Sequence, residues 1–237
     1  MLLINLLRDI ASGVLEFAYP IRCLKCDRLT NTFLCDECLS YVELIAPPIC
    51  GKCGKPSEYR LCHTCRTREF HFDRVRSSGP FQGILREAIH ALKYNKLQSV
   101  SIPLIKLLTQ TYPAGGLGKE FDMILPVPIH RSRMLERGFN QSELLAHGLA
   151  GHLGIPLETG VLYKAINTPH QVDLSPELRM INVRGSFGIN NPEKVMARRI
   201  LVIDDVVTTG ATLDEAARAL ICAGAKSVSG YTLSRSL

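Results

Sequence analysis

The sequence predicts an α/β fold, in which a parallel sheet is flanked by helices and a small cysteine-rich module precedes it. Eight of the nine cysteines form Cys-x-x-Cys pairs between residues 23 and 65. From residue 72 onward, short runs of branched apolar residues alternate with segments of helical periodicity. The expected parts are an N-terminal amphipathic helix, a cysteine module and an α/β domain, over residues 1–20, 21–70 and 71–237.

Composition narrows the kind of ligand and the location. The net charge of the 237 residues is +6, which favours anionic ligands but is too small to indicate nucleic-acid binding by itself. No run of about eighteen apolar residues occurs, so no transmembrane span is predicted. The apolar residues of the first segment share one helical face, and that face either docks on the body or lies on a membrane. The expected location is the cytoplasm, with a peripheral position at the inner membrane as the alternative.

The cysteine module contains an internal repeat, because each half reads C-x2-C-x8-C-x2-C. The x2 spacing lets both thiolates of a pair reach one metal ion, and two pairs complete a tetrahedral shell for a structural zinc. The repeat favours pairing along the chain, with a cross-braced arrangement as the alternative. We therefore expect two zinc ions, and the eight ligands are Cys23, Cys26, Cys35, Cys38, Cys50, Cys53, Cys62 and Cys65. Cys222, on the apolar side of the last helix, is expected to be a core residue.

The elements of the α/β part follow from hydrophobic periodicity. Helices are expected where apolar residues recur every three or four positions, over 83–94 and 102–111, around Leu144–Leu153, and from residue 213. Buried strands are expected over 75–81, 123–127, 185–189, 200–203 and 226–233. Their alternation favours a parallel sheet with the ligand at the carboxyl ends of the strands.

Residues 200–212 carry the clearest chemical signal. An apolar strand ends in two aspartates, and a turn of small residues then opens a helix. The backbone N–H groups of such a turn converge on an anion, and threonine hydroxyls can donate to phosphate oxygens. Ionised carboxylates only accept hydrogen bonds, so they suit the hydroxyls of a sugar attached to that phosphate. The candidate ligand residues are Asp204, Asp205, Val206, Val207, Thr208, Thr209, Gly210, Ala211 and Thr212. A capping aspartate beside a solvated turn is the alternative; a GxxxxGK[ST] phosphate loop is absent from the sequence.

A second anion site is predicted after the strand over 123–127. A basic turn containing Arg131, Arg133 and Arg137 leads there into the next helix. Arg131 and Arg137 are the candidates for binding, with a solvated arginine cluster as the alternative. Lys93 is a further candidate near the anionic site, and a solvated lysine at a helix end is its alternative.

These motifs resemble a known family. Residues 200–212 resemble the phosphoribosyl pyrophosphate (PRPP) motif of type I phosphoribosyltransferases. Together with LPVPIHRSRMLERGFNQSELLA (125–146), TPHQVDLSPELRMIN (168–182) and Gly185-Ser186-Phe187, they resemble the ComF/GntX family, which has a double zinc ribbon before a phosphoribosyltransferase domain. One departure is Lys164, in a neighbourhood where the family often has an arginine.

The resemblance implies specific roles for these residues. Asp204 and Asp205 would bind the ribose hydroxyls, the turn over 208–212 the 5′-phosphate, and the basic segment the pyrophosphate. Mg²⁺ would be held by PRPP itself. A flap over PRPP would carry Thr168, Gln171, Arg179 and Arg184. Charges on a helix surface are the alternative for Arg179 and Arg184.

The resemblance also implies a biological role. It is that of a PRPP-binding protein of natural competence and DNA uptake, which handles imported single-stranded DNA and meets DNA-processing proteins. Two alternatives stay open: an active phosphoribosyltransferase of nucleotide metabolism with an unknown acceptor, and a non-catalytic nucleic-acid-binding module. No side chain stands out as a general base, and no segment is recognisable as a hood over an acceptor base. The sequence does not predict an oligomeric state.

Overall fold

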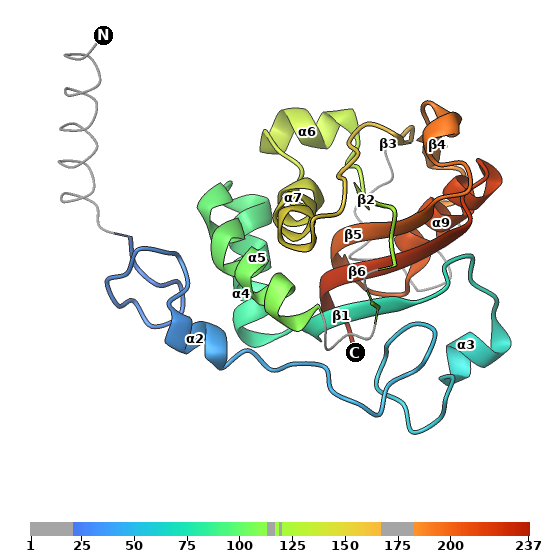
Figure 1. Ribbon diagram of the computed structural model, residues 1–237. Helices are drawn as coiled ribbons and strands as arrows, with labels where there is room; N and C mark the ends of the chain where they lie inside the picture. The colour runs from blue at the N-terminus through green and yellow to red at the C-terminus, as the bar shows by residue number, and fades with distance from the viewer. Residues whose placement is uncertain (1–20, 113–116, 119, 167–182) are drawn as a thin grey trace, which may run out of the picture.

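The fold is built on a four-stranded parallel sheet, seen in a computed structural model that describes residues 21–112, 117–118, 120–166 and 183–237 (Figure 1). The strand order is β1-β6-β5-β2, and every neighbouring pair is parallel. The strands are β1 Val75–Pro80, β2 Met123–Pro126, β5 Arg199–Val207 and β6 Ser227–Arg235. The predicted parallel sheet is thus confirmed, while the expected helix over 1–20 lies outside the described residues.

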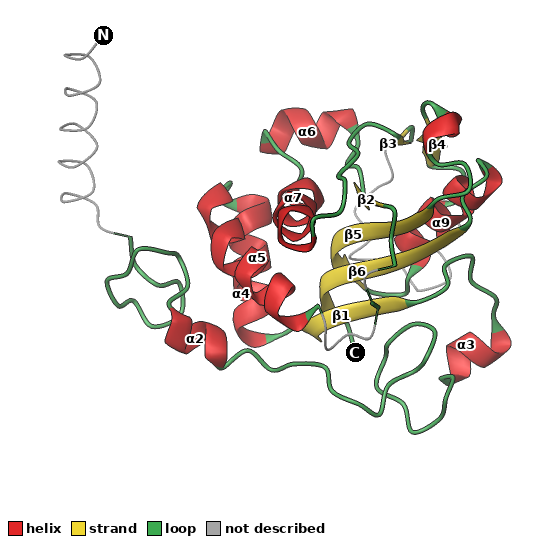
Figure 2. Ribbon diagram, in the orientation of Figure 1, coloured by secondary structure: helices red, strands yellow, loops and turns green. Residues whose placement is uncertain are grey.

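Both faces of the sheet are covered, which explains why its strands are apolar on both sides. Side chains alternate along β5: Leu201 and Ile203 pack into one core cluster, and Ile200 and Val202 pack into another. The first cluster is completed by α4, α5 and α7, and the second by α9 (Figure 2). These helices are α4 Gly83–Tyr94, α5 Ser101–Thr111, α7 Gln141–Leu153 and α9 Ala211–Cys222.

The remaining elements are short. An antiparallel pair lies beside the main sheet, formed by β3 Leu162–Lys164 and β4 Phe187–Ile189. The described part of the chain also contains five short helical elements: α2 Asp36–Ser40, α3 His63–Thr67, η1 Gln98–Val100, α6 Arg131–Arg137 and η4 Pro192–Lys194. Among the described residues, no helix combines the length and the apolar character needed to cross a bilayer.

Three sequence-based expectations about local structure are wrong. The basic segment is helix α6 and not a turn, because the His130 side chain caps its start and Gly138, at φ 82°, ends it. Asp204 and Asp205 lie inside β5, since pairing with β6 continues to Val207. Cys222 is exposed at the last residue of α9 and does not belong to the core.

The two cysteine repeats contact different parts of the α/β body (Figure 1). The first, residues 23–38, makes surface ion pairs with α4 and α5, where Lys25 meets Glu87 at 3.2 Å and Asp36 meets Lys106 at 2.7 Å. The second, residues 50–65, is bound to the edge of the sheet. The backbone N–H of Val75 donates to Lys52 O at 2.8 Å, and the buried guanidinium of Arg235 donates to a backbone carbonyl of this repeat.

Candidate ligand site and zinc centres

The eight paired cysteines form two compact tetrads, Cys23/Cys26/Cys35/Cys38 and Cys50/Cys53/Cys62/Cys65. Within each tetrad all four sulfur atoms lie within 4.8 Å of one another. The Sγ–Sγ distance is 3.8 Å for Cys26 and Cys35, and 3.7 Å for Cys53 and Cys62. A tetrahedral zinc with Zn–S bonds of about 2.3 Å needs about 3.8 Å. The tetrads therefore fit zinc, pairing along the chain is confirmed, and the cross-brace is wrong.

Backbone amides support the thiolates at matching positions of the repeat. Cys35 N–H donates to Cys23 Sγ at 3.5 Å, and Cys62 N–H donates to Cys50 Sγ at 3.3 Å. Such donors stabilise the charged, metal-binding form of sulfur. With four thiolates each, both shells are closed, so the zinc would stabilise the fold and leave no position open for a substrate.

A cavity of about 580 Å³ lies where all four strands of the sheet end. Its walls include residues that follow β1, β2 and β6, together with the last residues of β5. Ligands of parallel α/β sheets bind at this edge. The sequence-predicted residues that line the cavity are Lys93, Arg137, Asp204, Asp205, Val206, Val207, Thr208, Gly210, Ala211 and Thr212.

The two aspartates are held by different partners. Asp205 is buried, and its Oδ2 lies 2.7 Å from Lys93 Nζ. Asp204 Oδ1 accepts hydrogen bonds from Ser142 Oγ at 2.8 Å and from the Asp205 N–H at 2.9 Å. Burial raises the pKa of Asp204 to about 7, and the neighbouring charge of Asp205 adds to this effect. The structure thus places Lys93 at the acid pair and not in solvent.

The turn before α9 has the geometry of an anion cradle. Gly210 adopts φ 85°, a left-handed conformation that side chains disfavour, and the helix starts at the next residue without a side-chain cap. Thr209 lies outside the residues that line the cavity, and its hydroxyl accepts from Ala211 N–H at 3.3 Å. Thr208 and Thr212 line the cavity, so two hydroxyls and the first turn of α9 are available to an anion that binds there.

Cationic side chains also line the cavity. Arg133 and Arg137 line the cavity from α6, and Lys164 from β3. Burial lowers the pKa of Lys164, and the nearby charge of Arg133 adds to this effect. Arg131 is exposed and does not line the cavity. The helical form of the segment explains the difference, since residues two apart point in nearly opposite directions and residues four apart share a face.

Two residues at the start of α7 were not among the sequence-based candidates. Ser142 contacts Asp204, as described, and Gln141 is almost fully buried yet lines the cavity. Among the described residues, Gln141 Nε2 has no hydrogen-bond partner. A buried unpaired amide is costly, so a ligand atom is a natural partner for it. The only sequence signal was their place directly after the basic segment, at a helix start.

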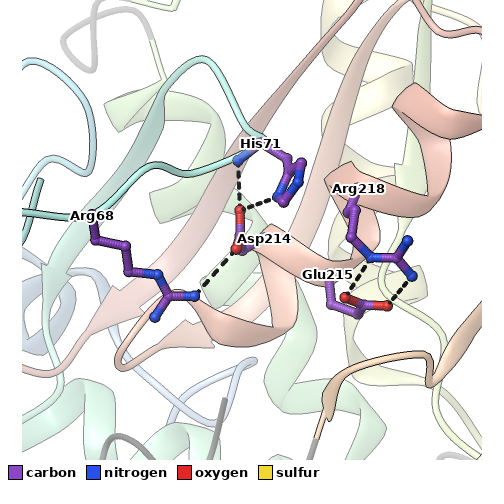
Figure 3. Close-up of polar contacts among 5 residues, drawn as sticks. All are labelled: Arg68, His71, Asp214, Glu215 and Arg218. Atoms are coloured by element: carbon purple, nitrogen blue, oxygen red, sulfur yellow. Dashed lines mark hydrogen bonds and ion pairs between the residues drawn. The ribbon is translucent and has the colours of Figure 1, made fainter. Parts of the chain in front are cut away.

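The first turn of α9 is fixed from two sides by acidic side chains (Figure 3). Asp214 accepts from the backbone N–H of His71 at 2.6 Å and lies 3.4 Å from the Arg68 guanidinium. Glu215 binds Arg218 at 2.6 Å and accepts from Gly185 N–H at 2.7 Å. The anion cradle is therefore linked to the segment that follows the second cysteine repeat and to the chain before β4.

The predicted flap is only partly covered by the structure. Thr168, Gln171 and Arg179 lie outside the described residues. Arg184 is described and is exposed. Its neighbour Gly185 contacts Glu215, so the described end of this segment is anchored on α9. The roles of all four residues remain predictions.

The fold and the site together define the class of this protein. The parallel sheet, the acid pair on its central strand, the glycine turn and the two cysteine tetrads form a type I phosphoribosyltransferase-like α/β fold preceded by a double zinc ribbon. Family models agree: a double zinc ribbon domain matches residues 14–67, and a phosphoribosyl transferase domain matches residues 140–235.

Similarity to whole proteins identifies the family. The DNA utilization protein YhgH of Salmonella typhimurium is 30% identical over 214 residues, which cover 88% of this chain and 93% of that protein. Competence protein ComFC of Bacillus subtilis is 31% identical, with 86% and 84% covered. Competence protein F of Haemophilus influenzae is 26% identical, with 92% and 98% covered. The chain belongs to the ComF/GntX family.

Proposed function

We propose that this protein binds PRPP in the cavity at the carboxyl ends of the sheet. The observation that carries the proposal is that an acid pair lines the same cavity as a helix N-terminus and two arginines. Asp204 and Asp205 lie beside the first turn of α9 and share one cavity with Arg133 and Arg137. PRPP has the matching order of groups, with a ribose diol between a phosphate and a pyrophosphate.

In this proposal each wall has one task. Thr208, Thr212 and the amides of the turn bind the 5′-phosphate, because a helix N-terminus favours anions. Asp204 and Asp205 accept hydrogen bonds from the ribose hydroxyls. Arg137 binds the pyrophosphate, which brings its own Mg²⁺. Gln141 Nε2 donates to a ligand oxygen and so gains the partner that it lacks.

The cellular role that we propose is in natural competence and DNA uptake. The names of the relatives support it, because they are called competence proteins and DNA utilization proteins. The protein would act in the cytoplasm or at the inner face of the membrane, on imported single-stranded DNA and with DNA-processing partners. We also propose that the chain divides at about residues 20 and 70 into an N-terminal segment, a zinc-ribbon module and an α/β domain.

Transfer of the phosphoribosyl group is the second candidate. A nucleophile would form a bond to C1 of the ribose while the bond from C1 to the pyrophosphate oxygen breaks, and pyrophosphate would leave with the bonding electrons. The cavity favours this candidate because its wall continues along α4, past Lys93 to Arg86, beyond the groups assigned to PRPP.

Calorimetry tests the binding proposal. PRPP with Mg²⁺ should bind more tightly than ribose 5-phosphate or pyrophosphate, and each fragment should compete with it. Asp205→Asn should weaken PRPP by about tenfold or more, since it removes a charged hydrogen-bond acceptor. The exposed Asp73→Asn is the matched control and should bind normally. Undetectable PRPP binding by the zinc-loaded protein would contradict the proposal.

A further inference from the structure

The two cysteine tetrads pack against different core clusters. Cys53 and Cys65 of the second tetrad pack against the second cluster, which also contains Leu213 from the first turn of α9. Cys23 and Cys38 of the first tetrad belong to the first cluster, together with α4, α5 and α7. Although the two tetrads have the same spacing in the sequence, the second therefore shares its side of the sheet with the helix of the anion cradle.

Two stacked rings lie between the second repeat and this cradle. Phe70 and Phe72 follow the repeat in the chain, and their ring centroids are 4.8 Å apart. A Cβ at Gly210 would lie 3.6 Å from Phe72 Cε1 and 3.8 Å from Phe70 Cε1, so both rings pack directly against the turn. Lys52, within the repeat, places its Nζ 5.8 Å from the Phe72 centroid. The rings therefore contact the repeat as well as the turn.

A buried guanidinium forms a second connection. Arg235 is 4% exposed and donates to the backbone carbonyl of Cys53. Its Nε has no hydrogen-bond partner within the described part of the chain. Four thiolates around one Zn²⁺ leave a net negative charge, which would offset this buried positive charge. The next residue, Ser236, donates its N–H to Val207 O at 2.9 Å, directly before the cradle. Arg235 thus joins the tetrad to the end of β5.

The backbone between the two rings is also fixed to α9. His71 lies between Phe70 and Phe72 in the chain, and its N–H donates to Asp214 at 2.6 Å (Figure 3). A shift of the rings would therefore move the start of α9, where the amides of the cradle lie. Amides that are already held in place bind an anion more tightly, because no ordering cost is paid on binding.

We propose that the second zinc centre is coupled to the phosphate cradle, and that Phe70, Phe72 and Arg235 are the positioning residues that carry this coupling. A closed second ribbon holds the rings and the guanidinium in place, so the cradle is preorganised for the 5′-phosphate. Coupling is reciprocal, so a sugar phosphate in the cradle strengthens zinc binding at this centre by the same factor. The inference rests on the proposed binding of PRPP and adds a dependence of that site on zinc.

Zinc titration in a chelator buffer tests the coupling. The zinc occupancy of the full-length protein is measured against the free zinc concentration, in excess Mg²⁺, alone and with PRPP, ribose 5-phosphate or pyrophosphate. PRPP and ribose 5-phosphate should tighten binding at one of the two centres by about tenfold. Pyrophosphate lacks the 5′-phosphate and should have no effect. An equal effect of all three ligands would indicate general stabilisation of the fold and would overturn the inference.

Two variants assign the effect to a centre and to the rings. Cys26→Ser removes a ligand of the first centre and should retain the ligand-dependent shift. Phe72→Leu should still bind two zinc ions at saturating zinc but lose most of the shift, because the ring beneath Gly210 is gone. Phe33→Leu is the matched control, since Phe33 lies in the first repeat and packs against the first core cluster. Loss of the shift in Cys26→Ser, or its full retention in Phe72→Leu, would overturn the inference.

The role of Arg235 is tested through its charge. Arg235→Met should weaken zinc binding at the second centre by about tenfold, and Arg235→Lys should restore most of the affinity because the charge remains. Arg28→Met is the control, since Arg28 is an exposed arginine of the first repeat. Equal zinc affinities of Arg235→Met and the unaltered protein would overturn the role of this residue in the coupling.

PRPP calorimetry on the same samples separates the two proposals. A protein that binds PRPP without any change in zinc affinity would overturn the coupling and leave the PRPP proposal intact. A zinc-loaded protein that does not bind PRPP would overturn the proposed function, and the coupling with it.

Discussion

Asp214 Oδ1 accepts a hydrogen bond of 2.6 Å from the backbone N–H of His71, and this bond joins the segment that follows the second zinc ribbon to the helix that starts at the anion cradle. The carboxyl group is buried and also contacts the His71 ring at 3.2 Å and Arg68. The chain that leaves the second zinc ribbon is therefore bound to the helix of the proposed phosphate site.

Replacing Asp214 tests this link. Asp214→Ala should lower the free energy of unfolding by about 1.5–3 kcal/mol, the range for a hydrogen bond to a charged group, as measured by urea denaturation. Asp36→Ala is the matched control, because its ion pair with Lys106 is exposed and should contribute less than about 1 kcal/mol. Equal losses of unfolding free energy in the two variants would show that the buried hydrogen bond contributes no more than the exposed ion pair.

The two zinc centres should differ in their effect on the body of the protein. We expect elemental analysis to give two zinc ions per chain, and one after either Cys26→Ser or Cys53→Ser. Cys53→Ser should lower the melting temperature of the α/β body more, since the buried Arg76 and Arg235 both donate to backbone carbonyls of the second ribbon. A larger loss in Cys26→Ser would contradict this view of the interface.

The helix α6 predicts which arginine binds pyrophosphate. Arg137→Ala should weaken PRPP by about ten- to a hundredfold and ribose 5-phosphate much less, because only PRPP carries the pyrophosphate. Arg131→Ala on the exposed face of the same helix is the control and should bind both ligands normally. Calorimetry with the two ligands measures the difference. If Arg137→Ala lowered the affinities for PRPP and for ribose 5-phosphate equally, Arg137 would not be a pyrophosphate-binding residue.

The buried amide of Gln141 predicts opposite effects on stability and binding. Gln141→Met removes a donor that is unpaired among the described residues, so the ligand-free protein should gain about 1 kcal/mol in free energy of unfolding. Affinity for PRPP should fall, since the ligand loses that donor. Gln110→Met, an exposed position on α5, should change neither quantity. A destabilised Gln141→Met with unchanged affinity would assign the amide a structural role.

The pKa of Asp204 predicts a pH dependence of stability. It is raised from an ordinary value of 3.8 to about 7, so the folded protein binds more protons than the unfolded chain between these values. The free energy of unfolding should therefore fall as pH rises through this window, and Asp204→Asn should remove that part of the fall. Urea denaturation of both proteins from pH 5 to 8 measures the difference, in which contributions from other groups cancel. Parallel profiles would show that Asp204 ionises normally.

Local features of the sequence predicted most of the fold. The apolar spacing of residues 83–94 gave the bounds of α4, and the run over 200–203 was correctly predicted to be a buried strand of a parallel sheet. The cysteine spacing predicted both tetrads, because each is formed within one repeat of short range. These signals are local: periodicity, turn chemistry and ligand spacing act within a few residues of each other.

The tertiary structure decided which side chains meet. The sequence left Lys93 between a solvated and a bound state, and only the packing of α4 on the sheet brought its Nζ to Asp205. The sequence analysis chose Arg131 over Arg133 as a binding residue, whereas the structure places Arg133 at the cavity. The segment has no clear apolar period, so its helical form was not predicted. A helix and a turn direct these two side chains differently. Cys222 was expected in the core because it lies on the apolar face of the last helix, but it is exposed. Helical periodicity predicts which face of a helix is apolar, and it does not predict how far along the helix the core extends. The contacts of Asp214 and Gln141 join segments far apart in the chain, so they depend on the fold as a whole and not on local pattern.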